Sequence, residues 1–333
     1  MAKANTAANA LLQYESGQEV TPMGAMTDAG DHKEFSVSGV DLWSQRSGYE
    51  PKIRPNGLIT GGVVTPGSAS DQVSVAAASC YLAGAETSVL ANAALAIARP
   101  AASPAGLKKI VSVTVNSGGS YAAVSGTDGD TLIATRGAAG GPPLIPAGSI
   151  EVAQVKLTSS GSAAITAAEI FQVPGSSQER YDSPVWDEDP INGTITFASA
   201  LPTIHEGSPA TTKGVYAEVA EPVFSDLEPA TDFVPPETTH SQSSTPVYGG
   251  ALGAASSSLG QGSFKLFLKD GITEPVIGLK DENLFFKHFP DRNKAPYLLC
   301  QGKFGISRTY PAGDNIQANC TITADSAAVE FSS

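Results

Sequence analysis

Long segments with a helical spacing of apolar residues are nearly absent from this sequence of 333 residues. Glycine and proline are frequent instead, with 34 and 23 copies, and alanine, serine and threonine crowd the stretches between them. Because glycine and proline favour turns, the apolar runs between them stay short. This pattern predicts a mainly β protein, an antiparallel β-sandwich or barrel of many short strands with one short helix.

The composition also limits the function. A formal net charge of −13, from 33 acids and 20 bases, argues against a protein that grips nucleic acid, because phosphate binding is driven by basic residues that displace counterions. The cysteines Cys80, Cys300 and Cys320 are widely spaced and have no clustered histidines, so neither a zinc site nor a disulfide framework is indicated. We expect no metal, no cofactor, and synthesis in a reduced cytoplasm.

The N-terminal segment offers no export or membrane signal. It carries one lysine and an alanine-rich run that Asn5 and Asn9 interrupt, so a signal-peptide core is not expected. No stretch of the sequence approaches the roughly 20 apolar residues that span a bilayer. This predicts a protein that is neither a membrane protein nor exported by the usual route.

Changes of amino-acid composition along the chain predict its domains. Residues 1–34 are polar and small, with a possible short helix around Ala7 to Gln13, and form either an arm that orders against something else or a disordered tail. From residue 67 to 174 aromatic residues nearly vanish, and TPGSAS and VPGSSQ bracket the stretch. We therefore expect 67–174 to be an inserted small β-domain, and 35–66 with 175–333 to form the main domain.

Local patterns inside the insert predict its elements. Valine alternates with serine and threonine over residues 111–115, which indicates a strand with one buried face. The alternation in IEVAQVKL slips near Ala153, which suggests a bulge. Glu169 follows Thr166 by three residues, a capping box that starts one helical turn. Residues 86–99 fit either a helix or paired strands.

The second half contains heavier residues and clearer strands. GTITFA, GVYAEVAEPVF, FKLFL and LFFKHF read as strands, whereas residues 228–262 read as a long loop too poor in apolar residues to hold itself in place. LLCQGKFGISR and IQANCTITA, joined by the turn TYPAGDN, predict an antiparallel hairpin. The residues expected on its two apolar faces are Leu298, Cys300, Phe304 and Ile306 on one strand and Ile316, Ala318, Cys320 and Ile322 on the other.

Residues that suggest chemistry have simpler explanations. The histidines (His32, His205, His240 and His288) are scattered, and we expect surface or structural roles for them. Asp187–Asp189 and the pair Asp128 and Asp130 lack the alternating oxygen ligands of calcium loops, so acidic turns are expected. The glycines between residues 249 and 262 precede a strand, unlike phosphate-binding glycines. No nucleophile elbow is present. These observations predict a protein without enzymatic activity.

Charge is distributed unevenly. Residues 182–237 contain eleven acids and one base, a balance of −10, whereas residues 264–310 contain eight bases and five acids, a balance of +3. A subunit that docks its acidic face on the basic face of a neighbouring copy would carry two such flanks. Solvated faces of a monomer would give the same charge distribution. The candidate interface residues are Lys265, Lys269, Lys287, Arg292 and Arg308 on the basic flank and Asp226, Glu228, Asp232 and Glu237 on the acidic flank.

Several segments together resemble the major tail tube proteins of long-tailed, siphovirus-like bacteriophages. SFKLFLKDG, followed by residues 285–331, is similar to the end of that family, with a strand, an aromatic strand, a hairpin and a last strand. YAEVAEPVFSDLEPATDFVPPE and DLWSQRSGYEPKIRPNGLITGG also look like it. The resemblance covers about 220 residues in pieces, none of them a sharp motif. The insert is similar in style to small β-modules of phage tail and fibre proteins, which suggests an outward-facing decoration.

The resemblance implies a β-sandwich whose inner sheets join around a ring of usually six copies, with rings stacked into a tube that conducts the genome. Its partners would be further copies of the chain, a tape measure protein, and tail terminator or distal tail proteins, with DNA passing through unbound. Assembly would take place in the bacterial cytoplasm and the product would be the virion tail. Phe264, Leu266, Leu268, Phe285 and Phe304 would be core residues.

Two other functions are compatible with the sequence. A distal tail or fibre protein that binds a host surface glycan would also carry a decoration-like insert. A secreted β-rich enzyme is the third class, and no catalytic constellation supports it.

Overall fold

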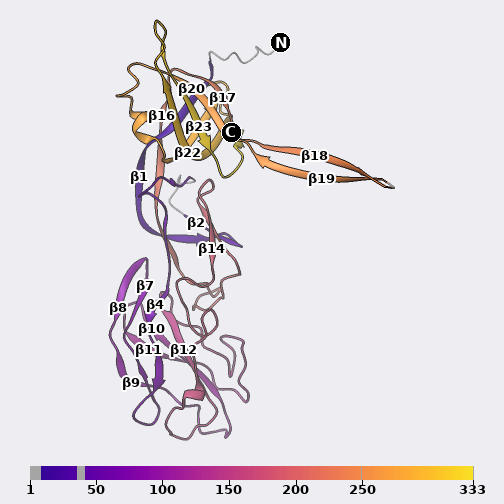
Figure 1. Ribbon diagram of the computed structural model, residues 1–333. Helices are drawn as coiled ribbons and strands as arrows, with labels where there is room; N and C mark the ends of the chain where they lie inside the picture. Colours follow the sequence, from indigo (N-terminus) through magenta and orange to yellow (C-terminus); the bar gives the residue numbers. More distant parts are fainter. Residues whose placement is uncertain (1–8, 36–41, 249, 333) are drawn as a thin grey trace. The chain divides into compact units, whose positions relative to one another are not determined.

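The computed structural model describes residues 9–35, 42–248 and 250–332, and its strand pairs are antiparallel (Figure 1). The chain is mainly β, which confirms the predicted fold class. It divides into two compact units: unit 1 comprises Met1–Thr21, Leu42–Pro51 and Val219–Ser333, and unit 2 comprises Pro22–Asp41 and Lys52–Glu218. Strands β1 (Leu11–Asp28) and β16 (Val215–Asp226) each continue from one unit into the other.

Unit 1 is built on a sheet with the strand order β1-β21-β22-β23-β20-β17. Strand β16 pairs with β1, and β24 pairs with β22. The bounds are β17 Ala230–Val234, β20 Gly262–Leu268, β21 Asn283–Phe289, β22 Tyr297–Thr309, β23 Ile316–Thr323 and β24 Val329–Phe331, with a short 3₁₀ helix at Pro275–Leu279.

Aromatic rings from three strands form the centre of unit 1. Phe264 of β20, Phe286 of β21 and Phe304 of β22 have ring centroids 5.7 to 6.2 Å apart, and all three side chains are buried. Such ring contacts contribute about 0.5–1.5 kcal/mol each beyond the burial of their area. The predicted core residues are confirmed, with Leu268 only partly buried and the others buried: Phe264, Leu266, Phe285 and Phe304.

The predicted hairpin of the C-terminal region is confirmed. Strands β22 and β23 pair from Lys303↔Thr323 to Thr309↔Gln317. Cys300 and Cys320 are both buried in the same core and are free thiols. Alternation was a reliable signal here because one face of each strand packs on the aromatic core.

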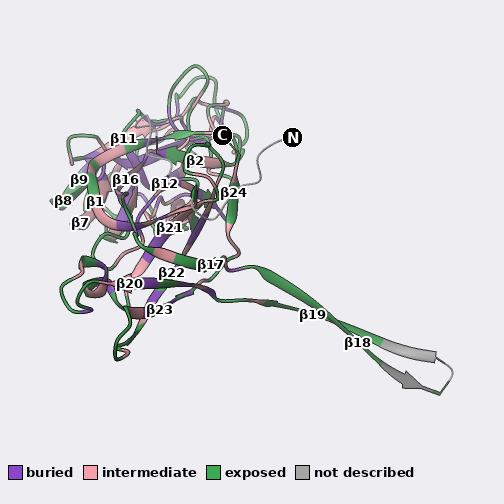
Figure 2. Cartoon of the chain, turned by 90° about the horizontal axis from the view of Figure 1, so that it is seen from above, coloured by how far each residue is buried: buried purple, intermediate pink, exposed green. Residues whose placement is uncertain are grey.

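The predicted long loop at residues 228–262 is wrong. This stretch contains β17 and a hairpin of two ten-residue strands, β18 (Thr238–Val247) and β19 (Gly250–Leu259), which form a sheet of their own. Figures 1 and 2 show the hairpin extending away from the other strands of unit 1, and its residues 238–244 and 253–258 are exposed. The expectation failed because neither face of the hairpin packs on the core, so its strands show no apolar alternation.

The expected N-terminal arm is also wrong for the residues that the structure describes. Leu11 to Tyr14 pair with β21, and Leu12 and Tyr14 are buried in the core of unit 1. A helix around Ala7 to Gln13 is excluded from residue 11 onward, and the rest of that prediction lies outside the described residues, apart from Asn9 and Ala10. The alternation of Leu12 and Tyr14 is a strand signal that polar neighbours obscure.

Unit 2 contains three small sheets with a common core and a fourth group of strands. The sheets have the orders β4-β7-β8, β5-β6-β9 and β11-β10-β12-β13, while β2, β14 and β15 pair with one another and with β1. The bounds are β2 His32–Phe35, β3 Lys52–Pro55, β4 Gly57–Gly61, β5 Val64–Pro66, β6 Gln72–Val75, β7 Ala78–Leu82, β8 Ala85–Val89, β9 Asn92–Ala96, β10 Lys109–Val115, β11 Tyr121–Ser125, β12 Ile150–Leu157, β13 Ile170–Phe171, β14 Trp186–Asp189 and β15 Thr194–Phe197.

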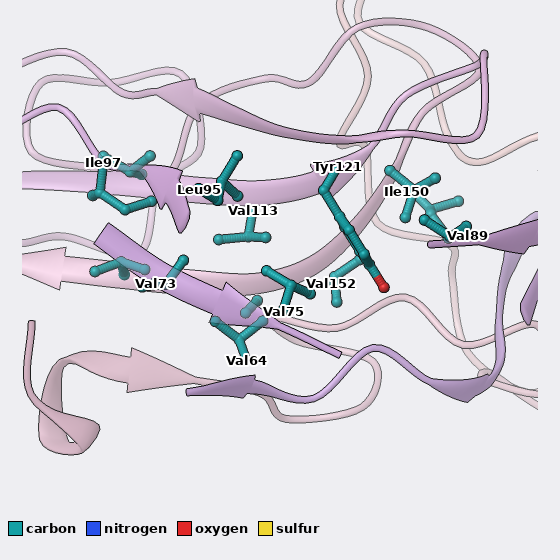
Figure 3. Packing of buried hydrophobic residues seen from close by; sticks show 14 of the residues in the cluster. Val64, Val73, Val75, Val89, Leu95, Ile97, Val113, Tyr121, Ile150 and Val152 are labelled. Atoms are coloured by element: carbon teal, nitrogen blue, oxygen red, sulfur yellow. The ribbon is translucent and has the colours of Figure 1, made fainter. Parts of the chain in front are cut away.

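One core of unit 2 collects buried residues from Leu58 to Ile165, among which valine is the most frequent (Figure 3). Its limits differ from the predicted insert at residues 67–174, because β4 and β5 pair with β7 and β6 and belong to the same core. The change of amino-acid composition after Pro66 falls inside this folded region and does not mark its boundary.

The local predictions for unit 2 have mixed outcomes. Strand β10 exists, but both of its faces are buried, and Ser112 on the face expected to be exposed donates a hydrogen bond to the buried Glu151. A bulge is confirmed at Val152, which is skipped between the pairs Val113↔Ala153 and Thr114↔Glu151. The helical turn is confirmed at Ala167–Glu169, with the Glu169 carboxylate 2.8 Å from the Thr166 amide nitrogen. The ambiguous residues 86–99 form strands β8 and β9, which lie in different sheets.

Candidate assembly surface

Four of the predicted interface residues pair with one another inside the chain. Lys265 Nζ lies 2.9 Å from Asp232 Oδ2 across neighbouring strands β20 and β17, and Arg292 Nη2 lies 2.8 Å from Glu228 Oε1. The hydrogen bond from Lys265 lowers the pKa of Asp232. All four side chains are well exposed, and water screens such pairs strongly. They therefore remain accessible to a partner.

The other basic candidates have different surroundings. Arg308 Nη1 donates to the Gly271 carbonyl oxygen at 2.6 Å, and Lys269 is exposed two residues before Gly271. Lys287 Nζ lies 4.0 Å from the centre of the Phe224 ring and 5.4 Å from that of Tyr297. Burial lowers the pKa of Lys287. The basic residues therefore do not form one continuous patch by contact with each other.

The remaining acidic candidates lie near the ends of strands. Asp226, at the end of β16, accepts a hydrogen bond from Gln13 Nε2 at 2.8 Å. Glu237 is exposed immediately before β18, and its carbonyl oxygen accepts a bond from the Gly260 amide, which closes the base of the β18–β19 hairpin. The acidic flank therefore borders the hairpin at Glu237.

The β18–β19 hairpin is the surface that sequence reasoning missed. Residues 238–259 contain no aspartate, glutamate, lysine or arginine, although 16% of the chain is charged. Cross-strand hydroxyls bond on one of its faces, with Ser241 Oγ 2.7 Å from Ser256 Oγ and Thr239 Oγ1 3.1 Å from Ser258 Oγ. Isolated two-stranded hairpins are at best marginally stable in water. Contact with another surface would stabilise this one.

A buried ionisable pair in unit 2 was also missed. Glu179 Oε2 accepts a hydrogen bond from the Glu151 amide at 2.6 Å, while Lys213 Nζ donates to the carbonyl oxygens of Arg180 and Ser183 at 2.8 and 2.6 Å. Burial raises the pKa of Glu179 to about 8 and lowers that of Lys213 to about 8. In the sequence, Lys213 is merely the one base of an acidic segment, and nothing in the pattern marks its burial.

The residues that the sequence suggested as metal-binding or catalytic candidates do not form a common site. Within the described ranges, no group of three or more histidines, cysteines, aspartates or glutamates is arranged to hold a metal ion. Asp187 lies in strand β14, so the expected acidic turn there is wrong, although Asp189 Oδ1 accepts bonds from the Ile191 and Asn192 amides of the following turn. Asp128 forms an ion pair of 2.9 Å with Lys109. These acids have structural partners.

Comparisons with protein-family models, curated proteins and solved structures give no match for this chain. Among the residues that the structure describes, none of the helices has the length and apolar character needed to cross a membrane. The functional argument therefore depends on the surface features above.

Proposed function

We propose that this chain is a structural subunit of a phage tail tube, which assembles with further copies of itself into stacked rings of six subunits, the number that the family resemblance implies. The observation that carries the proposal is the β18–β19 hairpin. It is long, uncharged and exposed, and it has no core of its own. A surface of this kind is stabilised when it packs on a neighbouring subunit.

Strand edges of unit 1 support the same proposal. Strand β17 lies at the end of the sheet order and pairs only with β20 along the described chain, so its other edge is open. Open edges in soluble proteins are normally covered, and pairing with a further copy covers them. Asp232 lies in β17 and Glu228 shortly before it, and with their partners Lys265 and Arg292 these exposed charges would set the orientation of the neighbour.

Negative-stain electron microscopy of the purified chain tests the proposal. Tubes or stacked rings are the expected result, whereas trimers or isolated particles at every protein concentration would contradict it and favour a distal tail or fibre protein. The genome would pass through the tube without specific binding, as the net charge of −13 suggests.

A pair of matched variants tests the role of the hairpin. Ala254→Glu places a charge on its exposed β19 strand, and Ala102→Glu places the same charge on an exposed loop of unit 2. We expect the first variant to remain a folded monomer without tubes, because burying an unpaired charge is costly. The second variant should assemble like the wild type. Equal tube yields from both variants would remove the hairpin from the assembly contact.

A further inference from the structure

Unit 2 contains a cavity with a mixed polar and apolar lining that the proposed assembly does not use. Its volume is about 180 Å³, and Glu179 and Lys213 are among the residues that line it. Both side chains are at least nine-tenths buried. A cavity of roughly 150 Å³ holds a molecule the size of benzene, so this one accommodates part of a six-membered ring. Waters or a ligand of that size are its possible occupants.

The buried pair lacks hydrogen-bond partners in this region. Glu179 Oε1 has none among the described residues, and the Lys213 ammonium, with three N–H groups, has two acceptors, both main-chain carbonyl oxygens. A hydroxyl group both donates and accepts. A ligand with neighbouring hydroxyls therefore supplies a partner for Glu179 Oε1, whether the carboxyl group is protonated or ionised, and an acceptor for the ammonium at the same time.

The rest of the lining has the same mixed character. Ser176, Ser183 and Ser199 add hydroxyl groups to the lining, while Pro184 and Pro202 give apolar walls. The lining contains two acids and one base, but Glu151 forms an ion pair with Arg136, which leaves Glu179 and Lys213 as one acid and one base and favours a neutral ligand over an ion. Hydroxyls together with apolar C–H faces are the chemistry of a sugar ring.

We propose that this cavity binds a neutral saccharide through a single inserted ring. The hydroxyls of the ring would bond Lys213 Nζ, the Glu179 carboxylate and the serines, and its C–H groups would pack on the prolines. This proposal is independent of tail tube assembly, because the cavity lies entirely within unit 2. We expect weak binding, with a dissociation constant on the order of 1 mM for a monosaccharide.

Saturation-transfer NMR on the full chain tests the proposal with the methyl glycosides of glucose, galactose and N-acetylglucosamine as probes. Glycine serves as a zwitterionic probe and sialic acid as an anionic one. At least one neutral glycoside should give a signal. The absence of a signal from every neutral glycoside would overturn the proposal, and a signal from glycine or sialic acid alone would overturn the assignment to a neutral sugar.

Two matched variants show whether the signal comes from the cavity. Ala200→Leu narrows the exposed mouth and should weaken binding about tenfold or more, whereas Ala102→Leu adds the same side chain to an exposed loop elsewhere in unit 2 and should bind like the wild type. Both positions are exposed, so both variants should fold. Equal binding by the two variants would show nonspecific contact and refute the site.

Discussion

Replacement of Glu179 by glutamine should change how the stability of unit 2 depends on pH. The carboxylate is buried, and burial raises its pKa to about 8 from the usual value of 4.5. The amide oxygen of glutamine still accepts the hydrogen bond from the Glu151 amide, which the carboxylate accepts at 2.6 Å in the wild type. The substitution therefore removes the proton-binding group and leaves that contact in place.

The sign follows from the raised pKa. Below pH 4.5 the carboxyl is protonated in both the folded and the unfolded chain, so its stabilising contribution is fully present. As the pH rises toward about 8, the unfolded chain releases a proton that the folded chain retains, and stability is lost at about 1.4 kcal/mol per pH unit. Between pH 5 and 7 the loss is roughly 3 kcal/mol as an upper value.

Other groups of unit 2 with shifted pKa values are present in both proteins, among them Lys213, His205, His32 and Glu188. Burial lowers the pKa of Lys213 to about 8, so its contribution changes in the opposite direction, with stability regained as the pH rises from about 8 toward 10.5. Burial also lowers the pKa of His205, so the contribution of this group to stability increases as the pH rises toward 6.5, opposite to the contribution of Glu179. The difference between wild type and variant isolates Glu179 between pH 5 and 7.

Amide hydrogen exchange in strands β10 and β12 measures the free energy of opening of unit 2 directly. The wild type should lose stability from pH 5 to 7 relative to Glu179→Gln, and the exposed control Glu86→Gln in β8 should keep the wild-type slope. Equal slopes for all three proteins would refute the assignment of a buried, protonated carboxyl to Glu179.

Three further predictions follow from the fold. Replacement of residues 58–178 by a short linker should leave soluble protein, because the two ends meet where the Leu58 amide bonds the Glu179 carbonyl oxygen at 2.8 Å. Deletion of residues 67–174 removes the partners of β4 and β5 and should give insoluble protein. Solubility assays compare the two deletions. A nonspecific protease should cut the hairpin at residues 238–259 in the monomer and spare it in tubes, and equal cutting would mean that assembly does not cover it. Phe304→Ala should lower the free energy of unfolding by about 3–5 kcal/mol, while Leu90→Ala, at a position 86% exposed, should change it little in a urea titration.

The parts of the fold that the sequence predicted are those where one face of a strand packs on a core. The β22–β23 hairpin alternates because Phe304 and Cys320 face the aromatic cluster. The β18–β19 hairpin was read as a loop because neither of its faces is buried, and no periodicity results. Backbone pairing and the cross-strand hydroxyl bonds of serine and threonine define it.

The site was harder to predict than the fold because it depends on strand order. Asp232 and Lys265 were assigned to opposite flanks of neighbouring subunits, yet the order β23-β20-β17 places them on adjacent strands of one chain. Likewise, Lys213 Nζ bonds the carbonyl oxygens of Arg180 and Ser183, which lie 33 and 30 residues earlier in the sequence. Spacing along the chain does not reveal either arrangement.

The position of β1 has a consequence for synthesis on the ribosome. Glu15 of β1 accepts a hydrogen bond from the Phe285 amide of β21, 270 residues later in the chain. At roughly 5–20 residues per second, on the order of 15 to 50 s pass between the emergence of the two strands. During that time the core of unit 2 is already complete in sequence, while Leu12 and Tyr14 still lack their partners. The nascent chain therefore carries an unpaired apolar strand that a chaperone can bind until the last third is made.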